Sequence, residues 1–217
     1  MAYRELFESV AEHVRRQGVK VRFACGKPLA PAAMDRARAE AFIPIPPSLI
    51  DFYAEIGDGL EFGWSSKGKN VPFANHEICK LDAWAPKSID GVSWHTEWRD
   101  DYEFPHLEDS ALAKKTALKM RKWLPFWGIG NGDCLRLDTS ADPSPLLFNK
   151  HDWYNGGSGE NGHKIAESLI DFYSDWARVC FQFPSSLWWP GVLNKNGEGI
   201  DWASDEFREP FRMTAGQ

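Results

Sequence analysis

The sequence predicts a single domain of the α+β class, in which an antiparallel or mixed β-sheet is flanked by helices. Its 217 residues are 43% hydrophobic and 26% charged, which suits one well-buried core better than two small domains. Helical and strand patterns follow one another without the regular alternation of a doubly wound fold. We expect the domain to span residues 1–180, with its core at about 22–180, and a tryptophan-rich extension at 181–217 to pack on it.

The N-terminal segment predicts a helix, a strand and a second helix. Between residues 3 and 17, apolar side chains recur at the spacing of an amphipathic helix, and Gly18 is placed to end it. In VKVRF, Val19, Val21 and Phe23 alternate with polar residues, as in a strand with one buried face. The stretch CGKPLAPAAMDRARAEAF then leads through a glycine and two prolines into the second helix.

The hexapeptide SLIDFY occurs twice, at residues 48–53 and 168–173. The first copy predicts a short helix that starts near Pro47 and ends at Gly57 or Gly59. The second copy predicts a longer helix, because apolar residues continue at helical spacing on both sides of it: Ile165, Leu169, Phe172, Tyr173, Trp176 and Cys180. Similarity does not extend beyond the hexapeptide, so we interpret the copies as two helices that meet one packing need, each with its aspartate pointing away from the apolar face.

The segments between and after these two helices predict strands, an acidic loop, a further helix and an irregular tail. Residues 71–84 predict a short strand and a helical turn, and residues 85–122 an acidic loop and helix that leave the core. The clearest signal is WLPFWGIGNGDCLRLDTS, in which two strand-like runs flank Asn131-Gly132, a dipeptide typical of hairpin turns. PLLFNK predicts a further strand, and the segment after residue 180 is irregular and aromatic.

Net charge, the length of apolar runs and the spacing of cysteines argue against several classes of protein. The net charge of −6 argues against a nucleic-acid binder, which would show a basic surface. No apolar run is long enough for a signal peptide or a membrane span, so we expect a cytoplasmic protein. Cys25, Cys79, Cys134 and Cys180 lie far apart without a disulfide framework, which favours reduced thiols.

Motifs for catalysis, metals and cofactors are missing. GIGNGD lacks the last glycine and the following helix of a dinucleotide-binding turn, and no Walker A loop occurs. The six histidines show no zinc-ligand spacing, and there is no G-x-S-x-G elbow. We therefore predict no catalytic residue, no metal and no cofactor, although a catalytic group assembled from distant residues would leave no motif.

Residues 26–62 resemble the opening of the SUKH superfamily, which includes the fungal Smi/Knr cell-wall regulators and many bacterial immunity proteins. The resemblance rests on Gly26, Glu40, Pro46-Pro47, the helix from Leu49 to Ile56, and Asp58-Gly59, where the family usually has asparagine before the glycine. WLPFWGIGNGDCLRLDTS, PLLFNKHDW and AESLIDFYSDW resemble the family's hairpin, next strand and closing helix, in that order.

The resemblance implies a non-enzymatic α+β protein. Bacterial members are implied to be immunity proteins that bind and neutralise an exported toxin domain, often a nuclease or deaminase. Such a toxin is often basic because it binds nucleic acid, and an acidic inhibitor associates quickly with a basic partner. We expect one cognate toxin partner, no contact with nucleic acid or membrane, and a monomer in preference to an oligomer.

Under this interpretation, exposed acids and aromatics on loops and on the open sheet face would bind the partner. The candidates are Asp58, Glu61, Trp64, Asp100, Asp101, Asp133 and Asp138. Each also has a structural interpretation, in the core or in a turn.

Two alternatives stay open. One is a regulatory interaction scaffold of the Smi/Knr kind. The other is a protein that binds a carbohydrate or another small ligand, or acts on it, with Trp188, Trp189 and Trp202 as a stacking platform.

Overall fold

The fold was analysed in a computed structural model. It describes residues 3–41, 43–57, 59–65, 119–120, 122–128, 133–150, 161–184, 186, 188–196, 199–207 and 211–213. The elements in chain order are α1 (Tyr3–Arg16), β1 (Lys20–Cys25), α2 (Pro31–Glu40), α3 (Pro47–Ile56), β2 (Leu60–Ser65), β3 (Trp123–Gly128), β4 (Cys134–Asp138), β5 (Leu146–Asn149), β6 (His163–Ala166), α6 (Leu169–Ala177) and the short 3₁₀-helix η4 (Trp189–Val192).

The described strands form two antiparallel sheets, which confirms the predicted α+β class. β1 pairs with β2 in a two-stranded sheet, and β3, β4, β5 and β6 form a four-stranded sheet in that order. The predicted hairpin is present as β3 and β4, and the PLLFNK strand as β5. The turn at Asn131-Gly132 lies outside the described residues, as do the predicted elements at 71–84 and residues 85–118 of the excursion predicted at 85–122.

The N-terminal elements follow their sequence patterns closely. The apolar positions of α1 are all buried, and Gly18 adopts a φ of 76° directly after the helix. In β1 the exposed residues alternate with half-buried Val21, Phe23 and Cys25, which pack on the core. One face of this strand is therefore turned towards α1 and the other towards solvent.

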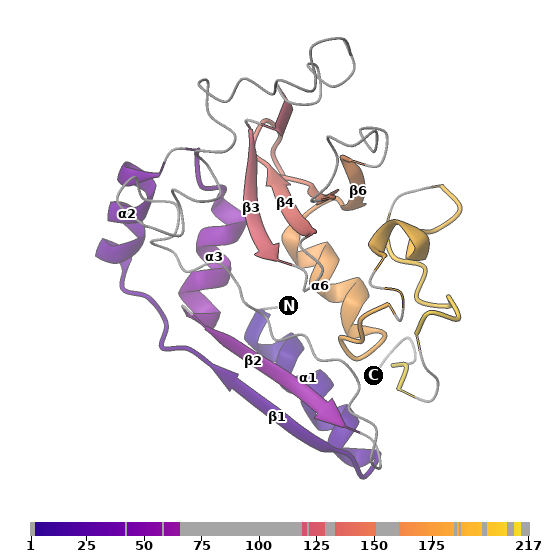
Figure 1. Cartoon of the computed structure of the whole chain (residues 1–217). Coiled ribbons are helices and arrows are strands. Elements are labelled where there is room, and N and C mark those ends of the chain that lie inside the picture. Colours follow the sequence, from indigo (N-terminus) through magenta and orange to yellow (C-terminus); the bar gives the residue numbers. More distant parts are fainter. Residues whose placement is uncertain are drawn as a thin grey trace.

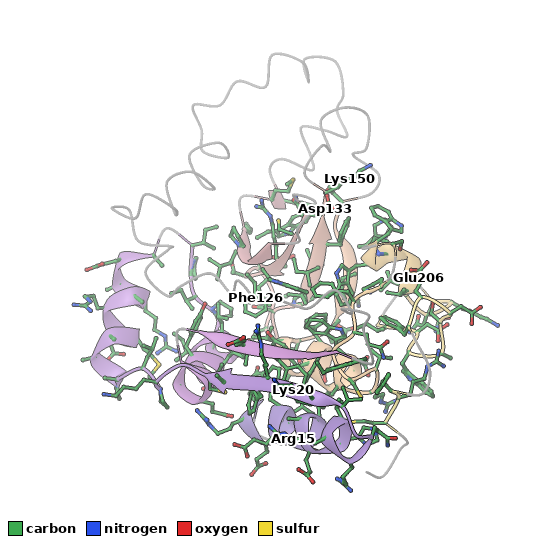
Figure 2. All side chains as sticks on the ribbon, turned by 60° about the horizontal axis from the view of Figure 1, so that its bottom comes forward. Arg15, Lys20, Phe126, Asp133, Lys150 and Glu206 are labelled. Atoms are coloured by element: carbon green, nitrogen blue, oxygen red, sulfur yellow. The ribbon has the colours of Figure 1, made fainter. Side chains whose placement is uncertain are left out.

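Three helices meet in the centre of the fold. α1, α3 and α6 contact one another pairwise, α1 also contacts β1, and α6 contacts β6 (Figure 1). The rings of Phe52 and Tyr173, one from each SLIDFY copy, stack at a centroid distance of 5.4 Å. Phe52 also meets Phe126 of β3 edge-on, and Figure 2 shows Phe126 in the interior of the molecule. The two copies thus pack against each other and join the helices to the larger sheet.

The predicted helix from Ile165 to Cys180 is wrong at both ends. Ile165 belongs to β6, and α6 begins only at Leu169 because the hydroxyl of Ser168 caps it by accepting from the Asp171 N–H. After Ala177 the chain turns, and Cys180 adopts a φ of 54°. The second SLIDFY copy therefore lies in a helix of 9 residues, shorter than the 10-residue α3.

The C-terminal segment packs on α6 and the larger sheet. Trp189 is completely buried against Trp127 of β3 and against Phe172 and Trp176 of α6. Trp176 donates its indole N–H to the Gln182 carbonyl at 2.5 Å. Figure 1 shows this segment in yellow beside α6. Aromatic side chains of the C-terminal segment thus belong to the same hydrophobic core as α3, α6 and β3.

The half-buried carboxyl group of Asp175 on α6 gives this region a pH dependence. Burial raises the pKa of Asp175, nearby Asp171 raises it further, and Arg178 and a backbone hydrogen bond from Ile200 oppose the shift. Since the raised pKa means tighter proton binding in the folded state, the carboxylate form weakens the fold above that pKa.

We therefore expect Asp175→Asn, which keeps the acceptor for Ile200, to be more stable than the wild type at neutral pH. The gain should shrink as the pH falls through the raised pKa towards the ordinary value of 3.8. Urea unfolding between about pH 4 and 7 measures both trends. A gain that is independent of pH would contradict the assignment.

Candidate functional site

The predicted acidic contact residues do not form one surface among the described residues. Glu61 is exposed on β2, where its carboxylate pairs with Arg22 of β1 at 2.7 Å. Asp138 ends β4 and accepts hydrogen bonds from the backbone N–H and the hydroxyl of Ser140. Glu61 is therefore an exposed carboxylate that is already paired with a cation, whereas Asp138 supports a turn. Asp58, Asp100 and Asp101 lie outside the described residues.

Two predicted contact residues are buried, which corrects the expectation that they are exposed. Trp64 is 4% exposed and donates its indole N–H to the Cys180 carbonyl at 2.9 Å. Asp133 is 2% exposed and lies with Lys150 at one end of the four-stranded sheet (Figure 2). Trp64 links β2 to the turn after α6, so its indole stabilises the core.

The tryptophans of the ligand-binding alternative do not form a platform. Trp189 is buried in the core, as described above. Trp188 is half-buried, with its ring edge-on to Phe148 at 5.0 Å and with the Lys150 ammonium 5.8 Å from its centre. Trp202 is 43% exposed, but the Arg178 guanidinium lies 5.4 Å from its ring. Because Trp189 is inaccessible, the three rings cannot stack on one ligand.

A different surface feature lies where the two SLIDFY helices meet the start of α1. It is an open depression of about 360 Å³, which we call the acidic groove, and it is lined by Tyr3, Ser48, Asp51, Ala54, Glu55 and Ile170. Tyr3 comes from α1, Ile170 from α6 and the other lining residues from α3. Asp171, the neighbour of Ile170, is exposed beside it. Three helices distant in sequence therefore build one concave surface.

Carboxylates dominate the electrostatics of the acidic groove. The pKa of the Tyr3 phenol is raised, first by burial and then by the negative charges of Asp51, Glu55 and Asp171. The Tyr3 hydroxyl donates to the Ser48 carbonyl at 3.3 Å. A phenol held neutral beside three carboxylates marks a region of negative potential.

One cation lies close to this cluster. The guanidinium of Arg4 donates to the Glu55 backbone carbonyl at 2.7 Å, and the Arg4 backbone N–H donates to the Glu55 carboxylate at 3.2 Å. Asp171 accepts from the Ser168 hydroxyl at 2.6 Å as part of the α6 cap. No described residue pairs with the carboxylate of Asp51, so the groove keeps an excess of negative charge.

Sequence reasoning missed this groove, although its signal was present. The repeated hexapeptide places a serine and an aspartate near the start of each helix: Ser48 and Asp51 lie within α3, whereas Ser168 is the N-cap of α6 and Asp171 lies in its first turn. Both aspartates are predicted to point away from an apolar face, and both are exposed. The contact between the two helices could not be read from either pattern alone.

The described residues outside the acidic groove offer little that could bind a metal ion or act as a nucleophile. Within them, no group of three histidine, cysteine or acidic side chains could hold a metal ion. Cys25, Cys134 and Cys180 are free thiols, whereas Cys79 lies outside the described ranges. Burial raises the pKa of the Cys180 thiol to about 12, which keeps it protonated and unreactive. Among the residues described, no helix is both long and apolar enough to cross a membrane.

Comparison with known proteins gives one informative result. Neither curated proteins nor solved structures produced a significant match. The model of the SMI1 / KNR4 family (SUKH-1) matches residues 28–175, from just before α2 to the last turn of α6. This range covers more than half of the chain and includes both SLIDFY helices and the four-stranded sheet. The chain therefore belongs to the SMI1/KNR4 (SUKH-1) family, which includes toxin immunity proteins.

Proposed function

We propose that this protein is an immunity protein that binds a cognate exported toxin domain and neutralises it. Its membership of the SMI1/KNR4 family is the observation that carries the proposal. The net charge of −6 and the acidic groove formed by α1, α3 and α6 also favour a basic protein partner. A nuclease or deaminase domain, which is often basic, fits this description.

The mechanism is stoichiometric binding in the cytoplasm of the cell that makes the toxin. The protein covers the toxin's active site or holds the toxin domain in an inactive state, and it performs no chemistry of its own. Opposite net charges accelerate the encounter and make the association rate depend on salt. Exposed acids such as Glu61 belong to the candidate contact surface.

Co-expression tests the proposal. An immunity protein is encoded directly beside its toxin, so the toxin domain of the neighbouring gene should kill host cells when expressed alone. We expect cells that also express this protein to grow normally. A toxin domain from an unrelated system is the control and should still kill. Failure to rescue cells from the neighbouring toxin, with both proteins present in the lysate, would refute the proposed function.

A further inference from the structure

We propose that the acidic groove is the docking site for a basic side chain of the toxin domain, with arginine as the preferred occupant. This inference rests on the proposed function and names the part of the surface that carries recognition. Its volume of about 360 Å³ lies near the lower end of pockets that hold small ligands. Such a depression accommodates one long side chain that projects from a protein surface.

A buried hydroxyl points to a missing partner in the groove. The Oγ atom of Ser48 exposes less than 1 Å² and has no hydrogen-bond partner among the described residues, and Ser48 is part of the groove wall. A buried polar atom without a partner is costly, and in native proteins such an atom calls for an explanation. A donor that enters the groove would reach this oxygen after a small shift of the atoms that cover it and would then satisfy it, which an apolar partner cannot do.

The charges around the hydroxyl specify the chemistry of the donor. Asp51 has no cationic partner among the described residues, and Asp171 and Glu55 add two more negative charges near Tyr3. Arg4 offsets part of this charge, but its guanidinium is held on the Glu55 carbonyl. The groove therefore selects a cation and disfavours an anion or a neutral group.

The geometry favours arginine. A guanidinium has five N–H donors in a planar fork and pairs well with carboxylates, whereas an ammonium is a compact and strongly hydrated charge. The groove offers acceptors on two helices, the Asp51 carboxylate and the Ser48 hydroxyl on α3 and the Asp171 carboxylate at the start of α6.

Two substitutions in the groove test the proposal. Asp51→Lys reverses the charge of the unpaired carboxylate, and Ser48→Ala removes the unpartnered hydroxyl. The matched control is Asp35→Lys, since Asp35 is also an exposed aspartate within a helix, α2, which contributes nothing to the groove. Thermal unfolding followed by circular dichroism shows whether each variant is folded. Ser48→Ala should leave stability unchanged or slightly higher, because the hydroxyl makes no hydrogen bond.

Affinity for the neighbouring toxin domain is measured by titration calorimetry. We expect Asp51→Lys to weaken binding at least about tenfold, roughly the loss of one favourable charged contact. Ser48→Ala should weaken binding several-fold, and Asp35→Lys should bind within about twofold of the wild type. Equal losses for Asp51→Lys and Asp35→Lys, or no loss for Asp51→Lys, would overturn the proposal while leaving the proposed function intact.

A second measurement does not need the toxin. Chemical-shift mapping of the protein with a hexa-arginine peptide should show perturbations at Tyr3, Ser48, Asp51 and Ile170 that vanish in Asp51→Lys. If the toxin domain does not bind but the peptide maps to these residues, the proposed function fails and the groove stands. Perturbations spread over all acidic surface residues would refute a specific site.

Discussion

Replacing Trp189 by alanine is expected to lower the free energy of unfolding by about 3–5 kcal/mol, the usual range for removing a large buried aromatic side chain. Trp189 is completely buried. Its ring lies 5.4 to 5.9 Å from the rings of Trp176, Phe172 and Trp127. The substitution would open a cavity between α6 and the four-stranded sheet. A domain of ordinary stability has a free energy of unfolding of about 5–15 kcal/mol, so this loss is a large share of it.

Urea unfolding measures the effect, with Trp202→Ala as the matched control from the same segment. Trp202 is 43% exposed, so its removal should cost less than about 1 kcal/mol. Trp189→Phe should fall between the wild type and Trp189→Ala, because the Trp189 indole nitrogen has no hydrogen-bond partner to lose in the part of the chain that the structure describes. If both alanine variants are equally stable, the C-terminal segment is not part of the core.

The second large effect is expected at Gly57, where the family-like helix α3 ends. Gly57 has a φ of 81° and a ψ of −168°, a backbone region that is essentially restricted to glycine and costs residues with a Cβ about 1–3 kcal/mol. A Cβ there would also clash with the carbonyl of Lys27 and lie 2.7 Å from the carbonyl carbon of Gly26. Gly57→Ala should therefore destabilise the protein by clearly more than the conformational cost alone, and should displace the loop between β1 and α2.

Gly18 separates these two contributions. It has a φ of 76°, and a Cβ built on it meets nothing within 4 Å. Gly18→Ala should accordingly cost only about 1–2 kcal/mol. The comparison is made by denaturant unfolding of both variants, and similar losses at the two positions would show that the approach of the Gly26 and Lys27 backbone to Gly57 is not important.

Local patterns were sufficient where an element is determined by its own side chains. α1 was predicted from the period of its apolar residues, α3 from Pro47 and Gly57 at its ends, and the β3–β4 hairpin from two strand-like runs around a turn. In these segments propensity, end signals and hydrophobic period all agree, which is why the prediction was correct.

Strands β2 and β6 were not predicted, because other signals in their sequences obscured the strand pattern. β2 was not predicted, although Leu60, Phe62 and Trp64 alternate and are all buried, because Gly59 directly precedes this short run and Gly63 interrupts it. β6 was absorbed into the following helix since Ile165 fits a helical period. Ser168 followed by Asp171 was the signal that separated them, because this pair caps α6.

The candidate site was the least predictable part. Exposed acids were expected to mark it, but the acidic groove depends on the packing of α1, α3 and α6, which are far apart in the chain. Burial of Trp64 and Trp189 likewise depends on contacts with the turn after α6 and with the larger sheet. Neither a helix pattern nor a tryptophan count contains this information.

The most direct test of the proposed neutralisation is a titration of toxin activity with the purified protein. At a toxin concentration well above the dissociation constant, a stoichiometric inhibitor should reduce activity linearly and abolish it at one molecule per toxin domain, at once and without further change in time. Complete inactivation by substoichiometric amounts that progresses with time would indicate an enzyme that modifies the toxin. Either that result or full toxin activity at a molar excess of this protein would contradict the account.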